Sequence, residues 1–184
     1  MLIIKIPARD DMFDEDTGQF FKMNEQTIKL EHSLLSLQKW EAKHNKYFLD
    51  NHDLSAEEIL DYIRCMTLNQ VPDWVYNCLT PENITEIRDY IQAPMTATWF
   101  SPTPGNHGGG QREIITAEVI YSSMFILNIP LDFEKRHLNH LLTLIRVCNE
   151  KQNPDTNKKK VSDYEMLRHY SELNKKRKAA MKNK

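Results

Sequence analysis

Glycine is scarce in this chain, and its shortage bears on the fold class. Only five of the 184 residues are glycine, and three of them stand together at Gly108–Gly110. Sandwiches and barrels need many tight turns between short strands, so we expect neither. Hydrophobic residues make up 40% and charged residues 27% of the chain, a composition typical of globular proteins. The length fits one domain with a tail.

Paired cysteines are also lacking. The chain has three cysteines, an odd number, and no Cys-x-x-Cys pair. Cys65, Cys78 and Cys148 each fall in an apolar context. Disulfide frameworks need paired cysteines and an oxidising compartment. We therefore expect three reduced thiols in or near the core of a cytosolic protein.

No apolar run is long enough for a membrane helix. The longest, Val119–Leu131, is interrupted by Ser122, Ser123 and Asn128 and falls short of the ~20 residues that a membrane helix needs. The apolar run Met1–Pro7 is short and is followed at once by charged residues, unlike a signal peptide. These features predict no membrane contact and a cytoplasmic location.

Catalytic motifs are absent as well. His137 and His140 have a spacing that metal ligands use on a helix, but no third ligand lies nearby, which favours a packing or surface role. Gly108–Gly110 lacks the Lys-Ser or Lys-Thr pair of a phosphate-binding loop. Cys148 sits in an apolar stripe, where a reactive thiolate is disfavoured. We expect no enzyme, no cofactor and no bound metal.

Residues 1–32 have the pattern of an N-terminal β-hairpin or short sheet. Leu2–Ile6 predicts a strand that stops at Pro7, and Gln26–Leu30 predicts the returning strand. The acidic turn Asp14–Gly18 lies between them. Its Asp-x-Asp-x-Gly pattern also permits a calcium loop, but no helix precedes it, which favours a plain hairpin turn.

Residues 33–150 have the periodicity of a helical core domain. Ser33–Lys43 repeats apolar residues at helical spacing, and Ser55 with Glu58 forms a capping box that opens the next helix. Pro72 begins a short helical turn. Thr80 and Pro81 then read as the cap and first residue of another helix. The fold class we predict is therefore mainly α (α+β).

The second half of this domain contains the most apolar sequence. Thr96–Phe100 suits a short strand that pairs back with residues 112–115 around a mobile loop, residues 101–111. Thr116–Ile129 is apolar nearly all round, and Leu138–Cys148 carries a clean apolar stripe. We expect these two segments to form a helical hairpin at the centre of the fold. The alternative is that part of it binds a partner helix.

Residues 151–184 form a basic C-terminal helix or tail. Ten basic and three acidic residues lie between Lys158 and Lys184. Such asymmetry suits nucleic acid, an acidic partner, the acidic body of the chain itself, or a solvated helix. The densest basic positions are Lys158, Lys159, Lys160, Lys175, Lys176, Arg177 and Lys178.

Several segments of the sequence resemble one protein family. They are Leu30–Leu34 with Lys39–Glu41, Glu58–Thr67, Pro94–Phe100, Arg112–Glu118 through Asn128–Pro130, His137–Asn139 and Leu141–Asn149. Together they resemble a family of small proteins from siphophage tail gene clusters that is associated with tail assembly chaperones. The resemblance runs from about residue 25 to the basic C-terminal helix. The chain departs from the family pattern at Ser122, Ser123, Arg136 and His140.

The resemblance implies a non-enzymatic role in virion morphogenesis, carried out in the host cytoplasm. Tail assembly chaperones coat the long helical tape measure protein until tube subunits polymerise around it, which needs an exposed apolar groove. Eight methionines suit an adaptable surface of this kind. The residues we expect on it are Met95, Trp99, Phe100, Met124 and Phe125.

The sequence also leaves two other functions open. One is a structural component of the virion, such as a tail or head–tail connector subunit, which would assemble as a homo-oligomer. The other is nucleic-acid binding through residues 158–184, toward which the overall net charge of −2 gives no bias. If the chain is a tail assembly chaperone or a structural component of the virion, its expected partners are the tape measure protein or other tail proteins.

Overall fold

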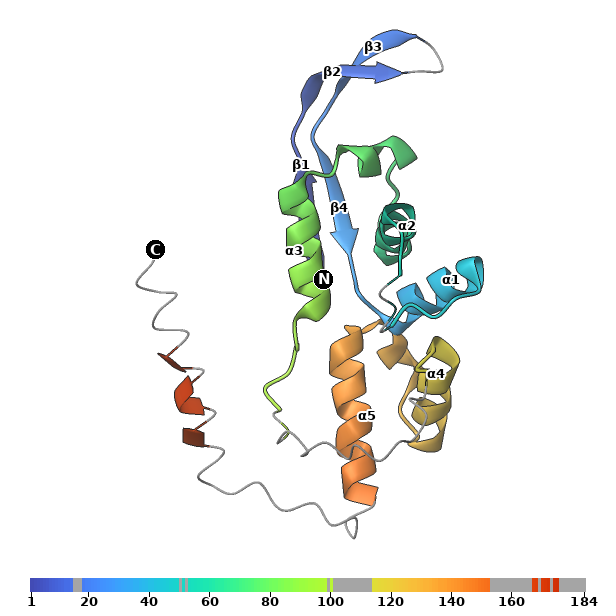
Figure 1. Ribbon diagram of the computed structural model, residues 1–184, viewed down its shortest axis with the longest axis vertical. Coiled ribbons are helices and arrows are strands. Elements are labelled where there is room, and N and C mark those ends of the chain that lie inside the picture. Colours follow the sequence, from blue (N-terminus) through green and yellow to red (C-terminus); the bar gives the residue numbers. More distant parts are fainter. Residues whose placement is uncertain are drawn as a thin grey trace.

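The computed structural model describes residues 1–14, 18–49, 51, 53–98, 100 and 114–152, together with 167, 168, 170–172, 174 and 175. Four N-terminal strands are followed by helices (Figure 1). The predicted fold class, mainly α with a small N-terminal β region, is confirmed. None of the helices in the described ranges combines the length and apolarity that crossing a membrane requires.

The N-terminal strands form two short antiparallel ladders. Strand β1 (Leu2–Ile6) pairs with β4 (Gln26–Leu30), and β2 (Arg9–Asp14) pairs with β3 (Gln19–Met23). Alternate side chains of β1 and β4 are buried, as the period of two predicts. The β2–β3 ribbon projects beyond the helices (Figure 1). The predicted hairpin is therefore confirmed, and residues 15–17 of its tip lie outside the described residues.

The helices of the first half begin at the predicted caps. Helix α1 spans Leu34–His44 with Ser33 as its N-cap, and α2 spans Ala56–Met66 with the complete Ser55–Glu58 capping box. A short 3-10 helix, η1, covers Asp73–Cys78. Helix α3 spans Pro81–Gln92, and Thr80 accepts a hydrogen bond from the backbone N–H of Asn83. Local capping chemistry thus determines where these helices start.

The second half contains α4 (Ala117–Ile126), the 3-10 helix η2 (Leu131–Lys135) and α5 (Leu138–Gln152). Pro130 separates α4 from η2, because proline cannot continue a helix. The three cysteines have free thiols, with Cys78 buried and the other two half-buried.

One core joins the strands to the helices. Its largest fully buried side chain, Trp40 of α1, donates from Nε1 to the carbonyl of Glu58 at 2.9 Å. Of helix α4, Ala117, Ile120 and Met124 are buried in this core and Tyr121 packs against it, whereas Phe125 and Ile126 are exposed. The prediction of a hairpin at the centre of the fold is therefore wrong for α4, which lies at the periphery beside α5 (Figure 1). The central residues are Ile4, Ile6, Ile28, Leu30, Leu34, Leu37, Trp40, Tyr62, Ile63 and Met66.

The described residues of the predicted strand Thr96–Phe100 are not in a strand. Residues 114 and 115, part of its predicted partner, are not in a strand either. Locally, the hydroxyl of Thr96 accepts from the backbone N–H of Thr98 at 3.0 Å, a bond that competes with sheet pairing. Residues 101–111 lie outside the described residues.

Candidate functional site

Three large apolar side chains are exposed at the end of helix α4. Phe125 is 68% exposed, Ile126 is 71% exposed, and Leu131, at the start of η2, is 52% exposed. We call these three residues the α4 corner. They lie within seven residues of chain, whereas exposed apolar residues on a globular protein are usually scattered singly.

The exposure of the α4 corner follows from how α4 packs. This helix packs against α1 and α5, and its exposed face carries Glu118 and Ser122 near its start and Phe125 and Ile126 at its end. Its C-terminal end turns sharply at Asn128, which has a φ of 52° in the left-handed region. The backbone N–H of Ile129 then donates to the carbonyl of Met124 at 2.9 Å. After this helix-ending turn the chain passes through Pro130 into η2, which begins at Leu131.

The other expected partner-binding residues have different surroundings. Met124 is 1% exposed and belongs to the core, so it cannot contribute to an exposed surface as the sequence suggested. Met95 is exposed, with a φ of 48° that turns the chain after α3. Phe100 is half-buried beneath the guanidinium of Arg146, 3.7 Å from its ring centroid. Trp99 lies outside the described residues.

These residues do not form one surface. The segment that follows α3 and helix α4 lie on opposite sides of α5 (Figure 1). Met95 and Phe100 are therefore separated from Phe125. Sequence reasoning missed Ile126 and Leu131. The signal was the apolar character of α4 on nearly all sides, because a helix at the edge of a small core leaves one side exposed.

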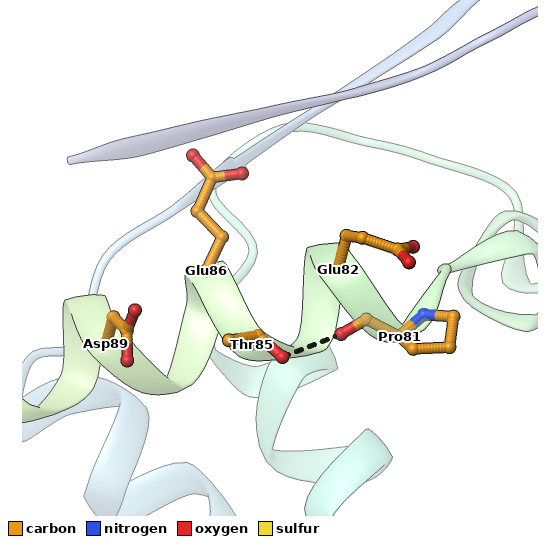
Figure 2. A pocket seen from close by; sticks show the side chains of 5 residues that line it. All are labelled: Pro81, Glu82, Thr85, Glu86 and Asp89. Carbon is orange, nitrogen blue, oxygen red and sulfur yellow. Dashed lines mark hydrogen bonds between the residues drawn. The ribbon is translucent and has the colours of Figure 1, made fainter. Parts of the chain in front are cut away.

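A second surface feature is an acidic depression on helix α3. Glu82, Glu86 and Asp89 line an open cavity of ≈ 420 Å³ together with Pro81 and Thr85 (Figure 2). The hydroxyl of Thr85 donates to the carbonyl of Pro81 at 2.9 Å, which leaves the carboxylates as its main polar groups. The hydroxyl of Thr80 lowers the pKa of Glu82. The depression therefore suits a positively charged ligand.

The buried polar groups hold helices together. Nδ1 of His32 lies 2.7 Å from the hydroxyl of Tyr62, and Nε2 of His137 lies 3.0 Å from the carbonyl of Tyr90. Burial lowers the pKa of His32 to about 3, and it lowers the pKa of His137 too. The expected packing role of His137 is thus observed. Within the described ranges, no three metal-ligating side chains gather at one point.

Charged groups on α1 and α2 also pair with each other. Asp61 is buried and lies 2.6 Å from Nζ of Lys43 and 2.7 Å from Nε2 of His44. The Lys43 ammonium and the His44 ring lower the pKa of Asp61 against the opposing effect of its burial. Each partner joins α1 to α2, so this cluster stabilises the helix pair.

Most of the basic C-terminal segment lies outside the described residues. Lys175 is exposed and helical, whereas Lys158, Lys159, Lys160, Lys176, Arg177 and Lys178 lie outside the described residues. Leu167 and Tyr170 are exposed on the same helical stretch. Residues 1–157 hold 14 basic and 23 acidic residues, so the body is as clearly acidic as the segment is basic.

Comparison with known proteins gives no match: no protein-family model, no curated protein and no solved structure matches the chain.

Proposed function

We propose that this chain is a tail assembly chaperone of a tailed bacteriophage, which binds the tape measure protein in the host cytoplasm while the tail is built. The observation that carries the proposal is the α4 corner, with three apolar side chains that are each more than half exposed. The resemblance of the sequence phrases to a siphophage tail gene family supplies the biological setting. A helical client with apolar anchors one turn apart fits such a surface.

The position of the α4 corner also supports this role. Phe125 and Ile126 are on a helix whose opposite side, at Ile120 and Met124, is anchored in the core. A surface on a packed helix is already in its binding conformation, which reduces the entropy lost on association. An aromatic residue flanked by aliphatic ones is typical of the centre of a protein interface.

Binding to the client tests the corner directly. We expect the double variant Phe125→Ser/Ile126→Ser to fold and to bind a helical tape measure fragment about 10- to 100-fold more weakly, because interface anchors are lost. Ile59→Ser is the matched control, since Ile59 is an exposed isoleucine on α2. Equal binding by all three proteins would rule out the corner as the client surface.

The fate of the chain during assembly tests the role itself. Mass spectrometry of gradient-purified particles and of the infected-cell lysate is expected to find the chain in the lysate and not in particles. A chaperone leaves its client before the particle is complete. A fixed copy number in finished particles would contradict the proposal.

One observation favours the alternative, a structural protein of the tail or head–tail connector. The β2–β3 ribbon projects from the body as a two-stranded arm (Figure 1). Arms of this kind can pair with a neighbouring subunit in a ring or tube. On this alternative the chain remains in the virion, so the particle experiment separates the two functions.

A further inference from the structure

The exposed face of helix α4 carries a charged residue as well as apolar ones. Glu118, Ser122 and Phe125 stand four and three residues apart, so they lie on one side of the helix. All three are exposed, and Phe125 belongs to the α4 corner. At 1.5 Å per residue, Glu118 and Phe125 are separated by about 10.5 Å along the helix axis. The face therefore has a carboxylate two turns before its apolar end.

The carboxylate of Glu118 has no cation beside it. The residues three and four positions further along the helix are its neighbours, and these are Tyr121 and Ser122, neither of them basic. In the ranges that the structure describes, Glu118 takes part in no ion pair. Burial raises the pKa of Glu41, and the charge of Glu118 raises it too. Two carboxylates thus lie close to each other at the start of α4.

The lysines that follow Glu41 in the sequence are paired with helix α2. Nζ of Lys43 lies 2.6 Å from Oδ2 of Asp61, and Nζ of Lys46 lies 2.6 Å from Oε1 of Glu58. Both ammonium groups therefore already have carboxylate partners, and neither pairs with the start of α4. The negative charge at this end of the exposed face is left for a binding partner to neutralise.

The α4 helix of a second copy does not supply the missing cation. Helix α4 contains no lysine or arginine. A copy of it laid along the face could cover Phe125, but it would place only apolar and hydroxyl side chains opposite Glu118. Nucleic acid does not fit either, because its phosphates would be repelled by the carboxylate. The face is complementary to a helix that has both apolar and basic side chains.

We propose that the occupant of this face is an amphipathic helix whose apolar side chains contact the α4 corner and whose lysine or arginine, two turns away on the same side, pairs with Glu118. This inference rests on the proposed function, because it specifies the client segment that the corner binds. Seven residues bring a side chain back to the same side of a helix within about 20°. Two helices that pack at about 20° move apart by only about 4 Å over two turns, which a lysine side chain can span.

Designed helical peptides test this chemistry. Each has roughly 21 residues in an alanine–glutamine host, long enough to form a helix, with two leucines one turn apart at its centre. The position seven residues before the first leucine and the position seven residues after the second are both lysine, both glutamine or both glutamate. Because the two ends match, the result does not depend on the direction in which the peptide lies.

NMR titration of the isotope-labelled full chain measures the three dissociation constants and shows whether the shifts fall on α4. At low ionic strength the lysine peptide is expected to bind about threefold more tightly than the glutamine peptide, and the glutamate peptide about threefold more weakly, the effect of one exposed charge pair. Salt should reduce these differences, since it screens exposed charges.

Variants of Glu118 assign the preference to this carboxylate. Glu118→Gln should bring the three dissociation constants within about twofold of one another, and Glu118→Lys should reverse their order. The matched control is Glu57→Gln, which removes the same charge from an exposed position in the first turn of α2 and should keep the preference for lysine. Circular dichroism confirms the fold of each variant. A preference that persists in Glu118→Gln overturns the proposal.

The remaining outcomes separate this inference from the proposed function. If the three peptides bind equally and Phe125→Ser/Ile126→Ser weakens them all, the corner binds helices without selecting a basic residue. This inference is then wrong, and the proposed function stands. If no peptide binds, both are overturned. Sedimentation velocity would in that case identify a second copy as the occupant, through self-association that Phe125→Ser/Ile126→Ser abolishes.

Discussion

The carboxylate of Glu41 on α1 caps the start of helix α4. Its Oε2 accepts a hydrogen bond from the backbone N–H of Ala117 at 2.8 Å, across 76 residues of sequence. Thr116, the N-cap residue of α4, makes no side-chain capping bond, so Glu41 supplies the missing acceptor. Oε1 of Glu41 accepts from the N–H of Phe48 at 3.2 Å. One buried carboxylate thus connects α1, the segment after it and α4.

Removal of this carboxylate should destabilise the fold. Glu41→Ala leaves the buried N–H of Ala117 without an acceptor, and we expect the free energy of unfolding to fall by about 2 kcal/mol. Urea denaturation followed by tryptophan fluorescence measures the change. Lys39→Ala, at an exposed position on the same helix, is the matched control and should change the free energy by less than about 0.5 kcal/mol. Equal effects of the two variants would show that the cap contributes nothing.

The buried histidines should make stability depend on pH. Burial lowers the pKa of His32 to about 3, well below its ordinary value of 6.5. Below pH 6.5 the unfolded chain binds a proton at this position and the folded chain does not, so the free energy of unfolding decreases as the pH falls. The slope is about 1.4 kcal/mol per pH unit, which amounts to about 2 kcal/mol by pH 5. The lowered pKa of His137 acts in the same direction.

Urea denaturation between about pH 7 and pH 5 measures this dependence. The interval stays above the range in which Glu58 and Asp61, whose pKa values are lowered, lose their contribution. His32→Asn should remove more than half of the slope, whatever it does to stability at pH 7. His140→Gln, a half-buried histidine one turn into α5, should keep the slope. A slope that survives in His32→Asn would refute the assignment.

Local patterns in the sequence predicted the helices and strands but not how they pack against one another. The Ser55–Glu58 capping box and the Thr80–Pro81 start could be read directly, because each involves neighbours a few residues apart. The hydrogen bond between Glu41 and Ala117 could not be predicted, since nothing near Glu41 in the sequence indicates contact with α4. The described residues of Thr96–Phe100 are not in a strand although their pattern suited one, since a local pattern does not supply the pairing that a strand needs.

The candidate site was predicted in part. The apolar character of α4 indicated a surface or a core, and periodicity alone could not decide between them, because the helix is apolar on nearly every side. Phe125 turned out exposed and Met124 buried, although they are adjacent. The acidic positions on α3 were visible in the sequence, but their place on a helix that packs against β1 depends on tertiary packing.

Asn139 should prove important for joining α3 to α5. Its Nδ2 donates to the carbonyls of Ile91 and Ala93 at 2.9 Å and 2.8 Å. Asn139→Ala is expected to lower the free energy of unfolding by about 2 kcal/mol, because both carbonyls lose their donor. Asn139→Asp should lower it further, since a carboxylate would face two carbonyl oxygens at the negative end of α3. Urea denaturation gives the order, and an aspartate variant as stable as the original chain would contradict it.

The adjacent residues Met124 and Phe125 should respond in opposite ways to substitution. Met124→Ala creates a cavity in the core and should lower the free energy of unfolding by about 2–4 kcal/mol. Phe125→Ser removes a mostly exposed ring and should change the free energy of unfolding by less than about 0.5 kcal/mol, while client binding becomes weaker. Urea denaturation of both variants and capture of a helical tape measure fragment by Phe125→Ser separate folding from binding. Severe destabilisation by Phe125→Ser would mean that this ring is part of the core, and the α4 corner would then lose its central residue.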